Sequence, residues 1–358
     1  MQDINYYMRA WETKKRLLKG EKIEGLPELW EGFVSKKPVV FQVETTNVCN
    51  MKCVMCPRTT KMKREAAHMK PETYKKVMDN IEPFKRIDLL NYRKFLSLEL
   101  AKNDIVNEDE DFFHFGISAE SLTMHGFGEP PLDPHIVERV KLAKEKGLKT
   151  YFSCNPMNVN EKVLKGLLEA GLDYLKYSID GLDPKTLAKY RGREVTKEDI
   201  YGKIEMALKM IKEGEHGTML VLTMLGFGGN QDQCKTFMKD WKDKKVFAYV
   251  KNCHNRWLFQ DDAPENTAHY MRTYCEYPFL CVCLLQDGTV TPCPVDYDGH
   301  LAMGNINEQS LEEIWNSKKY KEFRKMHLLG GIPKEHFCMA QCDAPIMGDA
   351  INGIRPKG

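Results

Sequence analysis

The sequence predicts an α/β protein whose core is a partial (β/α)6 barrel of the TIM type, followed by a smaller C-terminal subdomain. Short apolar runs, several of them rich in β-branched residues, alternate with helical patterns between residues 39 and 250. Strands that alternate with helices form parallel sheets, because each helix returns the chain to the same edge of the sheet. The 358 residues are enough for a large core and about two domains.

Six apolar runs and six amphipathic patterns make up the repeating part of the chain. The expected strands cover residues 39–44, 121–125, 149–153, 174–179, 218–223 and 246–250. The expected helices cover residues 71–81, 134–146, 161–170, 184–190, 197–213 and 231–242. In barrels of this kind, functional residues gather where strands end and loops begin. We therefore expect the working side chains at the carboxyl ends of these strands.

Two segments fall outside this repeat. Residues 1–37 predict one or two helices ahead of a core at residues 38–260, with the C-terminal subdomain at residues 261–358. The segment at about residues 85–115 mixes helix formers with an acidic patch and is longer than ordinary loops in compact domains. It is expected to be a lid, a binding loop or a small inserted helix, or else a solvated insertion without a role.

The composition argues against nucleic acid and membrane partners. Lys plus Arg number 53 and Asp plus Glu 51, so no strong net field attracts a polyanion or an anionic lipid surface. Residues 1–20 lack the apolar stretch of a secretory signal, and no run reaches the ~18 apolar residues of a membrane span. We expect a soluble cytoplasmic protein whose 12 cysteines stay reduced and serve mainly as metal ligands.

Three cysteines, Cys49, Cys53 and Cys56, follow the first expected strand with the spacing C-x3-C-x2-C. Iron–sulfur clusters normally take four thiolates, so a compact trio leaves one iron open to another ligand. A zinc ribbon would want a second cysteine pair further along, and a disulfide framework suits small secreted chains. The trio therefore favours a cluster with an open iron.

The trio also matches the pattern C-x3-C-x-Φ-C, with Met55 as the bulky residue, and so resembles the signature of the radical S-adenosylmethionine (SAM) enzymes. The resemblance implies a 4Fe-4S cluster on the three cysteines, whose open iron binds the amino and carboxylate groups of SAM. It also implies that the partial barrel is the radical SAM core of this family.

A glycine-rich turn follows the second expected strand as Gly126, Phe127, Gly128 and Glu129. The glycines let the backbone bend closely and expose its carbonyl groups, and the carboxylate suits an ammonium group. The turn resembles the family's Gly-Gly-Glu element, which recognises the amino group of SAM. The alternative is an ordinary turn in which Glu129 lies near the positive end of a helix.

Polar side chains continue around the same rim as Ser153, Asn155, Ser178 and Arg191. By resemblance, the first three face the ribose and methionine part of SAM, and Arg191 binds its carboxylate through the guanidinium group. Cys154 stands where many relatives carry Thr. Asp180 is expected to cap a turn.

A second set of thiolates, sufficient to saturate a cluster, comprises Cys275, Cys293, Cys338 and Cys342. The Asp-Gly pair at residues 287–288 predicts a hairpin that brings the first two side by side. A capping box that begins at Ser310 predicts a helix that returns the chain to the last two. A structural zinc site would use the same four residues.

Motifs around these cysteines resemble the auxiliary-cluster extension called SPASM or, in its one-cluster form, twitch. They are Cys-x2-Pro-Phe, Asp-Gly-x-Val-x-Pro-Cys, Gly-Asn-Ile, Glu-Ile-Trp-Asn-Ser and the closing cysteine pair, between residues 275 and 342. Cys281 and Cys283 fit the two-cluster pattern poorly. The resemblance therefore implies one auxiliary 4Fe-4S cluster.

The combined resemblance implies an oxidoreductase that cleaves SAM reductively to a 5′-deoxyadenosyl radical and abstracts a hydrogen atom from a small polar substrate. Twitch-type relatives include aminocyclitol and sugar dehydrogenases, so we expect oxidation of such an alcohol, with the auxiliary cluster as electron acceptor and flavodoxin or ferredoxin as reducing partner. The alternatives are an epimerase with a Cys hydrogen donor and an enzyme that modifies a ribosomal peptide. A non-catalytic iron–sulfur carrier would have no use for the SAM motifs.

Catalytic candidates follow from position alone, and they are Glu44, His125, His254 and Cys281. Glu44 and His125 lie on the first two expected strands, and His254 follows the sixth between Lys251 and Asn255. Further candidate hydrogen donors are Cys154, Cys253 and Cys283. A structural role is the alternative for each, because position without a shifted pKa is weak support.

Overall fold

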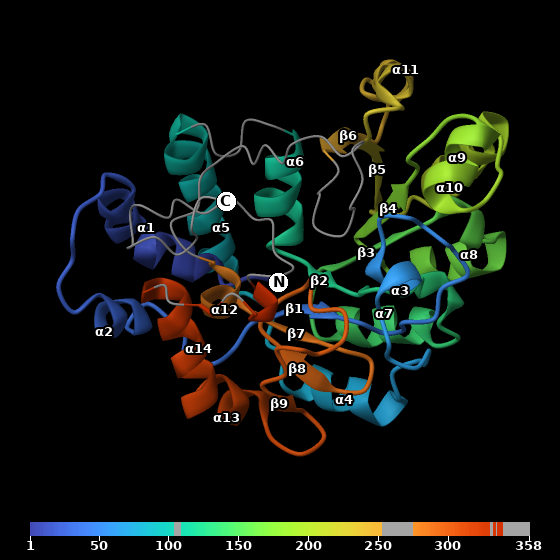
Figure 1. Ribbon diagram of the computed structural model, residues 1–358. Helices are drawn as coiled ribbons and strands as arrows, with labels where there is room; N and C mark the ends of the chain where they lie inside the picture. The colour runs from blue at the N-terminus through green and yellow to red at the C-terminus, as the bar shows by residue number, and fades with distance from the viewer. Residues whose placement is uncertain (104–108, 253–274, 330–331, 334, 339–358) are drawn as a thin grey trace.

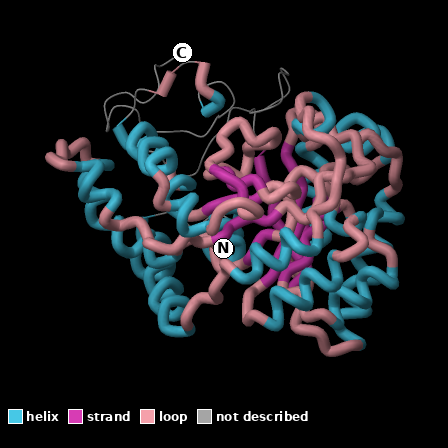
Figure 2. The backbone as a smooth tube through the Cα atoms, turned by 90° about the horizontal axis from the view of Figure 1, so that it is seen from below, coloured by secondary structure: helices cyan, strands magenta, loops and turns pink. Residues whose placement is uncertain are grey.

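The structure is a computed structural model of the chain, and it describes residues 1–103, 109–252, 275–329, 332–333 and 335–338. In this part of the chain a nine-stranded sheet has the order β6-β5-β4-β3-β2-β1-β7-β8-β9. The strands occupy the centre of the molecule, with helices on either side of them (Figure 2).

Six parallel strands confirm the predicted α/β core (Figure 1). They are β1 (Val40–Val43), β2 (Leu122–Thr123), β3 (Thr150–Cys154), β4 (Tyr174–Ser178), β5 (Met219–Gly226) and β6 (Phe247–Asn252). Three further strands extend the sheet beyond β1: β7 (Val282–Leu284), β8 (Thr289–Thr291) and β9 (Gly304–Asn305). β7 pairs with β1 in parallel, whereas β8 and β9 add antiparallel strands. The predicted C-terminal hairpin therefore continues the core sheet.

The six expected helices are present, each within two residues of its expected start and end. They are α4 (Pro71–Asp79), α7 (Ile136–Glu145), α8 (Glu161–Glu169), α9 (Pro184–Arg191), α10 (Lys197–Glu213) and α11 (Gln231–Trp241). Local signals explain the boundaries. Thr196 and Asp199 form a reciprocal capping box at the start of α10, and the Asp183 side chain caps α9 just before Pro184.

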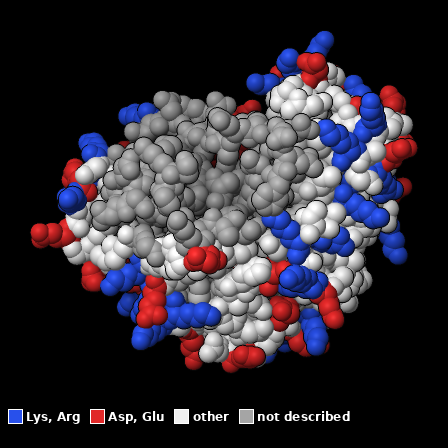
Figure 3. Space-filling model, viewed as in Figure 1, with Lys and Arg blue, Asp and Glu red and all other residues white. Residues whose placement is uncertain are grey.

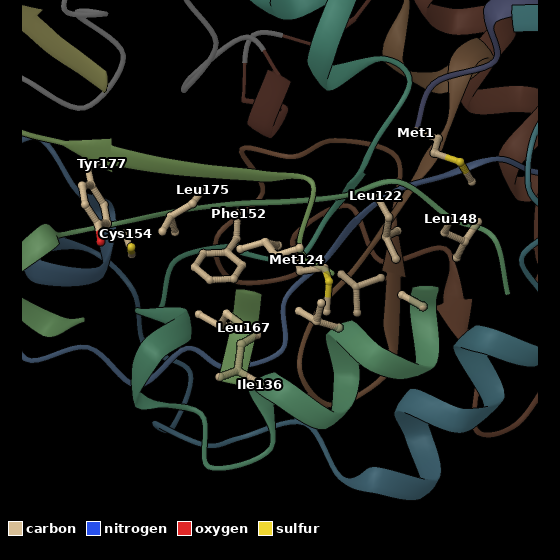
Figure 4. Packing of buried hydrophobic residues seen from close by; sticks show 14 of the residues in the cluster. Met1, Leu122, Met124, Ile136, Leu148, Phe152, Cys154, Leu167, Leu175 and Tyr177 are labelled. Carbon is tan, nitrogen blue, oxygen red and sulfur yellow. The ribbon is translucent and has the colours of Figure 1, made fainter. Parts of the chain in front are cut away.

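Side chains on the strands alternate between two environments. Leu175 and Tyr177 of β4 face the helices and join the main core, where they lie near Phe152 of β3 and Leu167 of α8 (Figure 4). The intervening Lys176 belongs to the opposite face, because successive strand residues point to opposite sides of a sheet. We call this opposite side the inner face.

The inserted segment is helical, and the part around Phe113 packs over the inner face. It forms α5 (Arg86–Phe95), a π-helical turn (Leu96–Leu100), a 3-10 turn (Ala101–Asn103), α6 (Asp109–Phe112) and a second π-helical turn (Phe113–Ser118). The Phe113 ring stacks on Tyr249 of β6 at 5.3 Å and meets Tyr151 of β3 edge-on at 5.4 Å. The structure therefore shows inserted helices, which are one of the alternatives that the sequence left open for this segment.

The N-terminal helices share a second core with the C-terminal part. α1 (Ile4–Leu18) and α2 (Leu26–Glu31) contribute to it, and so do α12 (Tyr277–Leu280) and Leu328 of α14 (Lys318–Leu329). Arg324 of α14 is buried and pairs with Glu31 of α2 at 2.6 Å. The predicted domain boundaries at residues 37/38 and 260/261 stay predictions, the second lying outside the described residues.

Basic and acidic side chains are interspersed over the face shown in Figure 3, as the balanced composition leads one to expect. Within the described ranges, no helix has the length and apolar character needed to cross a bilayer.

Candidate cluster and cofactor site

The loop between β1 and α3 (Pro57–Thr60) carries all three cysteines of the triplet. Burial raises the pKa of the Cys49 thiol and raises that of Cys56 to about 12. In the described part of the chain, no group of three His, Cys, Asp or Glu side chains is arranged to hold a single metal ion. A tetrahedral zinc site needs that convergence, whereas a cluster distributes its thiolates over several irons. The triplet supplies three of the four thiolates that an iron–sulfur cluster normally takes.

Contacts made by Arg58 and by Gly192 shape the cysteine loop. Arg58 donates from Nη2 to Cys49 O at 2.6 Å and from Nε to Asn47 O at 3.0 Å. Gly192, with φ 68°, ends α9 in the left-handed conformation, and a Cβ there would lie 2.7 Å from Lys52 Cβ. Only glycine allows this approach, so the end of α9 lies directly against the cysteine loop.

Arg191, at the end of α9, is predicted to bind the carboxylate of SAM. Its Nη1 lies 3.5 Å from Cys53 Sγ, and its Nη2 lies 2.5 Å from Asp180 Oδ2. Burial disfavours the charge, but the Asp180 carboxylate and the Cys53 thiol outweigh it and raise the pKa of Arg191. The Nε group is buried and has no hydrogen-bond partner among the described residues. Arg191 thus keeps one donor for an acceptor beside the cluster.

Asp180 does more than cap a turn. Its Oδ1 accepts a hydrogen bond from Leu225 N at 2.8 Å while Oδ2 holds Arg191, and its φ of 63° is unusual for a residue other than glycine. The side chain is fully buried. Asp180 therefore fixes the guanidinium of Arg191 next to the triplet.

Glu129 is buried on the opposite side of the cysteine loop. Its Oε1 accepts from Asn155 N at 2.8 Å, and its own N–H donates to Val48 O at 2.8 Å. Burial raises the pKa of Glu129 to about 7, against smaller lowering effects from Asn155, Asn158 and Arg191. Gly128 brings this turn so close to Thr46 that no Cβ would fit. A cation bound beside Glu129 would relieve the cost of its buried charge.

Together, Glu129 and Arg191 suit an amino acid group. One offers a buried carboxylate for an ammonium ion, and the other offers a free N–H donor for a carboxylate. Asn155, Ser178 and Arg191 line one cavity with Met51 of the cysteine loop. The described residues thus fit the methionine end of SAM, with the triplet as the cluster ligands.

The other predicted SAM contacts lie on neighbouring strands, beside an aromatic pair and in the glycine-rich turn. Ser153 and Ser178 lie on neighbouring strands, with their hydroxyl oxygens 2.9 Å apart. Met55 packs against the Tyr190 and Phe227 rings, which stack at 3.9 Å. Phe127 is buried toward Tyr297 of the C-terminal part, with ring centroids 6.2 Å apart. Gly126 lies in the same turn as Phe127.

Glu44, a catalytic candidate, is fully buried and has several partners. It pairs with Arg64 through both oxygens, at 2.7 Å and 3.1 Å. It also accepts from Phe127 N at 2.9 Å and from Gln286 N at 3.3 Å. Glu44 therefore joins β1 to the glycine-rich turn, the segment after the triplet and the C-terminal hairpin. We propose that it positions these loops.

His125 lies on the inner face just after β2. Its Nδ1 accepts from Ser153 N at 3.2 Å, and its ring meets Tyr151 edge-on at 5.2 Å. Burial, with repulsion from Lys176, lowers the pKa of His125 to about 3. The imidazole is consequently neutral near pH 7, and its catalytic role stays a prediction.

The remaining catalytic and hydrogen-donor candidates lie away from this face or outside the described residues. Cys281 and Cys283 are buried in the second core with the N-terminal helices. Cys154 faces the outer helices with Phe152. Cys253, His254 and Asn255 fall outside the described residues.

Three of the four predicted auxiliary ligands come together. Cys275, Cys293 and Cys338 line one cavity with apolar walls, alongside Phe323 and His327 of α14. His327 Nε2 lies 3.5 Å from Cys338 Sγ. Cys342 falls outside the described residues. The thiol set and the apolar walls fit a second cluster shielded from water.

Four residues that the sequence reasoning missed contribute to these sites: Arg58, Arg64, Lys176 and His327. Arg58 and Arg64 follow the triplet closely, so their proximity to it was the available signal. Lys176 is a charged residue in the middle of an apolar strand, which is rare without a function or partner. His327 carried no signal in sequence alone.

Comparisons with known proteins agree with this geometry. Residues 98–240 match the model of the Radical SAM superfamily, and residues 275–343 match SPASM, an iron-sulfur cluster-binding domain. The first range begins after the triplet, within the inserted segment. The chain therefore contains a radical SAM domain and a SPASM domain. It is an oxidoreductase whose cofactors are SAM, a 4Fe-4S cluster and a further iron–sulfur cluster in the SPASM domain.

Individual relatives are distant. The S-adenosyl-L-methionine-dependent 2-deoxy-scyllo-inosamine dehydrogenase of Niallia circulans is 22% identical over 301 residues, which cover 84% of this chain and 90% of the relative. The tungsten-containing aldehyde ferredoxin oxidoreductase cofactor-modifying protein of Pyrococcus furiosus is 24% identical over 330 residues, covering 79% and 82%. The structure of native anSMEcpe with bound AdoMet is similar in fold, with a TM-score of 0.54, 16% identity and coverage of 86% and 92%.

Proposed function

We propose that this enzyme oxidises an alcohol carbon of a small polar substrate, a sugar or an aminocyclitol, to a carbonyl. The carbon loses a hydrogen atom, its hydroxyl loses a proton, and one electron leaves for the auxiliary cluster. The single observation that carries the proposal is the apolar cavity that gathers three SPASM cysteines, because a shielded cluster suits electron acceptance. The similarity to the Niallia circulans dehydrogenase, over most of both chains, supports the same reaction class.

The chain's own residues would hold and orient the reactants. When bound, the cofactors supply the radical that removes the hydrogen atom. The triplet would hold the core cluster, while Glu129 and Arg191 would hold the amino acid part of SAM. Ser153 and Ser178 lie at the carboxyl ends of β3 and β4, next to Arg191's cavity. The substrate would then bind on the inner face of the sheet.

An epimerase would need a thiol near the same face to return a hydrogen atom. Among the described candidates, Cys154 lies on the outer face and Cys281 and Cys283 lie in the second core. Cys253 follows β6 directly and falls outside the described residues, so the deuterium experiment decides between the two outcomes. A ribosomal peptide remains the second substrate class, because the SPASM domain also occurs in peptide-modifying proteins, among which SuiB has been solved bound to precursor peptide SuiA.

The first electron would come from a protein such as flavodoxin or ferredoxin. That partner is part of the proposal and has no assigned docking surface in the described residues.

The test is to incubate the anaerobically reconstituted enzyme with SAM, a reductant and candidate sugars, aminocyclitols or peptides labelled with deuterium at carbon. Transfer of deuterium into 5′-deoxyadenosine identifies the substrate, and a product that has lost two electrons supports the dehydrogenase. A product with unchanged oxidation state, in which solvent hydrogen has replaced the deuterium at one carbon, would establish the epimerase instead.

A further inference from the structure

Lys176 lies in the middle of the inner face, close to the proposed cofactor site. Its backbone neighbours across the sheet are Ser153 on β3 and Val221 on β5. Its Nζ lies 2.9 Å from Tyr249 Oη, 4.7 Å from the Phe113 ring centroid and 5.3 Å from that of Tyr249. The ammonium group is thus held in an aromatic setting between β4, β6 and the inserted segment.

No carboxylate in the described part of the chain lies within ion-pair distance of Lys176. The two nearby acids already have cations: Glu110 of α6 pairs with Lys251 at 3.2 Å, and Asp180 pairs with Arg191 at 2.5 Å. An ammonium group has three N–H donors, and among the described residues the hydrogen bond to Tyr249 Oη uses one of them. Among the described residues, Lys176 is therefore a half-buried cation with donor capacity to spare.

Ionisable groups face Lys176 from every element around it. They are His125 after β2, Tyr151 of β3, Asp180 and Arg191 after β4, Tyr249 and Lys251 of β6, and Glu110 of α6. Burial has the largest effect and Lys251 adds repulsion, while Glu110 and Asp180 oppose them, so the pKa of Lys176 falls to about 7. An anion brought close to Nζ would favour the charged form and raise that pKa again.

A purely structural role would not need a charge at this place. A methionine would fill similar space without the desolvation cost of an ammonium group. The acceptor that the described residues do not supply points to a ligand that does. SAM already finds partners for both its charged amino acid groups in Glu129 and Arg191, which leaves Lys176 for another molecule.

We infer that Lys176 forms an anion subsite on the inner face, and that the substrate carries a carboxylate or phosphate group which this lysine binds. This inference names the substrate class and rests on the proposed function for the reaction that follows. Sugar acids or sugar phosphates are thereby favoured over neutral sugars. Lys176 is a binding residue in this account, so its loss is expected to raise the substrate KM more than it lowers kcat.

Nuclear magnetic resonance of the reconstituted, SAM-loaded enzyme labelled with 13C at lysine Cε tests the subsite without a known substrate. The probes are acetate, inorganic phosphate and, as the neutral isostere of acetate, acetamide. The Lys176 signal is assigned by its absence in Lys176→Met. It should titrate near pH 7 alone, and acetate or phosphate should raise its midpoint by about one pH unit or more, whereas acetamide should not.

Exposed Lys235 serves as the internal control, since its signal should ignore every probe. A Lys176 midpoint that neither anion moves overturns the inference. A midpoint already raised by SAM alone assigns the lysine to SAM and overturns it as well.

Steady-state kinetics of Lys176 variants provide an independent test. With a substrate identified, Lys176→Arg should retain affinity better than Lys176→Met, because the guanidinium keeps the charge. A neutral substrate whose KM is unchanged in Lys176→Met contradicts the inference while leaving the proposed oxidation intact. A product at the wrong oxidation state contradicts the oxidation and leaves the anion subsite intact.

Discussion

At the scale of single residues, the site depends on two buried charged groups that keep hydrogen-bonding capacity beyond their partners among the described residues. Glu129 and Arg191 lie on either side of the cysteine loop, one with a raised pKa and the other with a free N–H donor. Both positions were predicted from sequence because short motifs carry them. The role of Asp180, which orients Arg191, was not, since that contact depends on how α9 meets the end of β4.

Glu129 should make SAM binding depend on pH. Its carboxylate must be ionised to hold an ammonium group, and burial raises its pKa to about 7. SAM affinity should therefore fall as pH decreases below 7. Glu129→Gln should weaken binding by about 10- to 100-fold, the value of a charged hydrogen bond, and flatten this dependence. Calorimetric titrations between pH 6 and 8 (roughly one unit either side of that pKa) measure the SAM affinity and its pH dependence. If the affinity of Glu129→Gln for SAM depended on pH as that of the unaltered protein does, the assignment would be refuted.

Replacing Glu44 distinguishes a positioning role for this residue from a catalytic one. Glu44→Gln leaves Arg64 with a buried, poorly paired charge, so the free energy of unfolding should fall by about 3 to 5 kcal/mol. Glu12→Gln, at an exposed pair, is the control and should change it by less than about 1 kcal/mol. Denaturant titration of both variants gives the comparison. A Glu44 variant of normal stability that cannot turn over substrate would show a catalytic role instead.

At the scale of elements, the six strands and six helices agree with the predicted ranges because each has its own apolar period and capping signal. The inserted segment was left open because nothing local shows which surface it covers. Its aromatic residues answer that question: Phe113 is 7% exposed and stacks on the inner face, whereas neighbouring Phe112 is 47% exposed. The segment closes one side of the sheet.

This packing gives a matched pair of variants. Phe113→Ala should lower the free energy of unfolding by about 3 to 5 kcal/mol, because it leaves a cavity between α6, β3 and β6. Phe112→Ala should cost much less, near the roughly 0.5 kcal/mol typical of surface changes. Thermal or denaturant unfolding of the two proteins compares them. Equal losses would mean that the segment does not pack on the sheet as described.

At the scale of the whole molecule, the C-terminal part belongs to the same sheet as the core. The sequence predicted its hairpin and cysteines, but not the pairing of β7 with β1, which joins residues about 240 positions apart. Arg64 reinforces this junction by donating to Tyr297 O at 2.7 Å while it holds Glu44. The glycine-rich turn and the SPASM hairpin are thus connected through one ion pair.

It should nevertheless be possible to remove the auxiliary cluster without losing the core cluster. Cys293→Ala removes an auxiliary ligand, so bound iron should fall from about eight to about four atoms per chain. SAM cleavage should persist, whereas oxidised product should disappear because its electron acceptor is gone. Iron analysis and product assay of the variant test this. Full product yield without the auxiliary cluster would contradict the proposed electron path.

The central claim is that Cys49, Cys53 and Cys56 hold a cluster with an iron to which SAM binds. Electron paramagnetic resonance of the anaerobically reduced protein, recorded before and after SAM is added, tests it most directly. We predict that SAM changes the spectrum of the core cluster and that Cys53→Ala abolishes the change. A triplet that holds only zinc, or a cluster spectrum indifferent to SAM, would contradict the account.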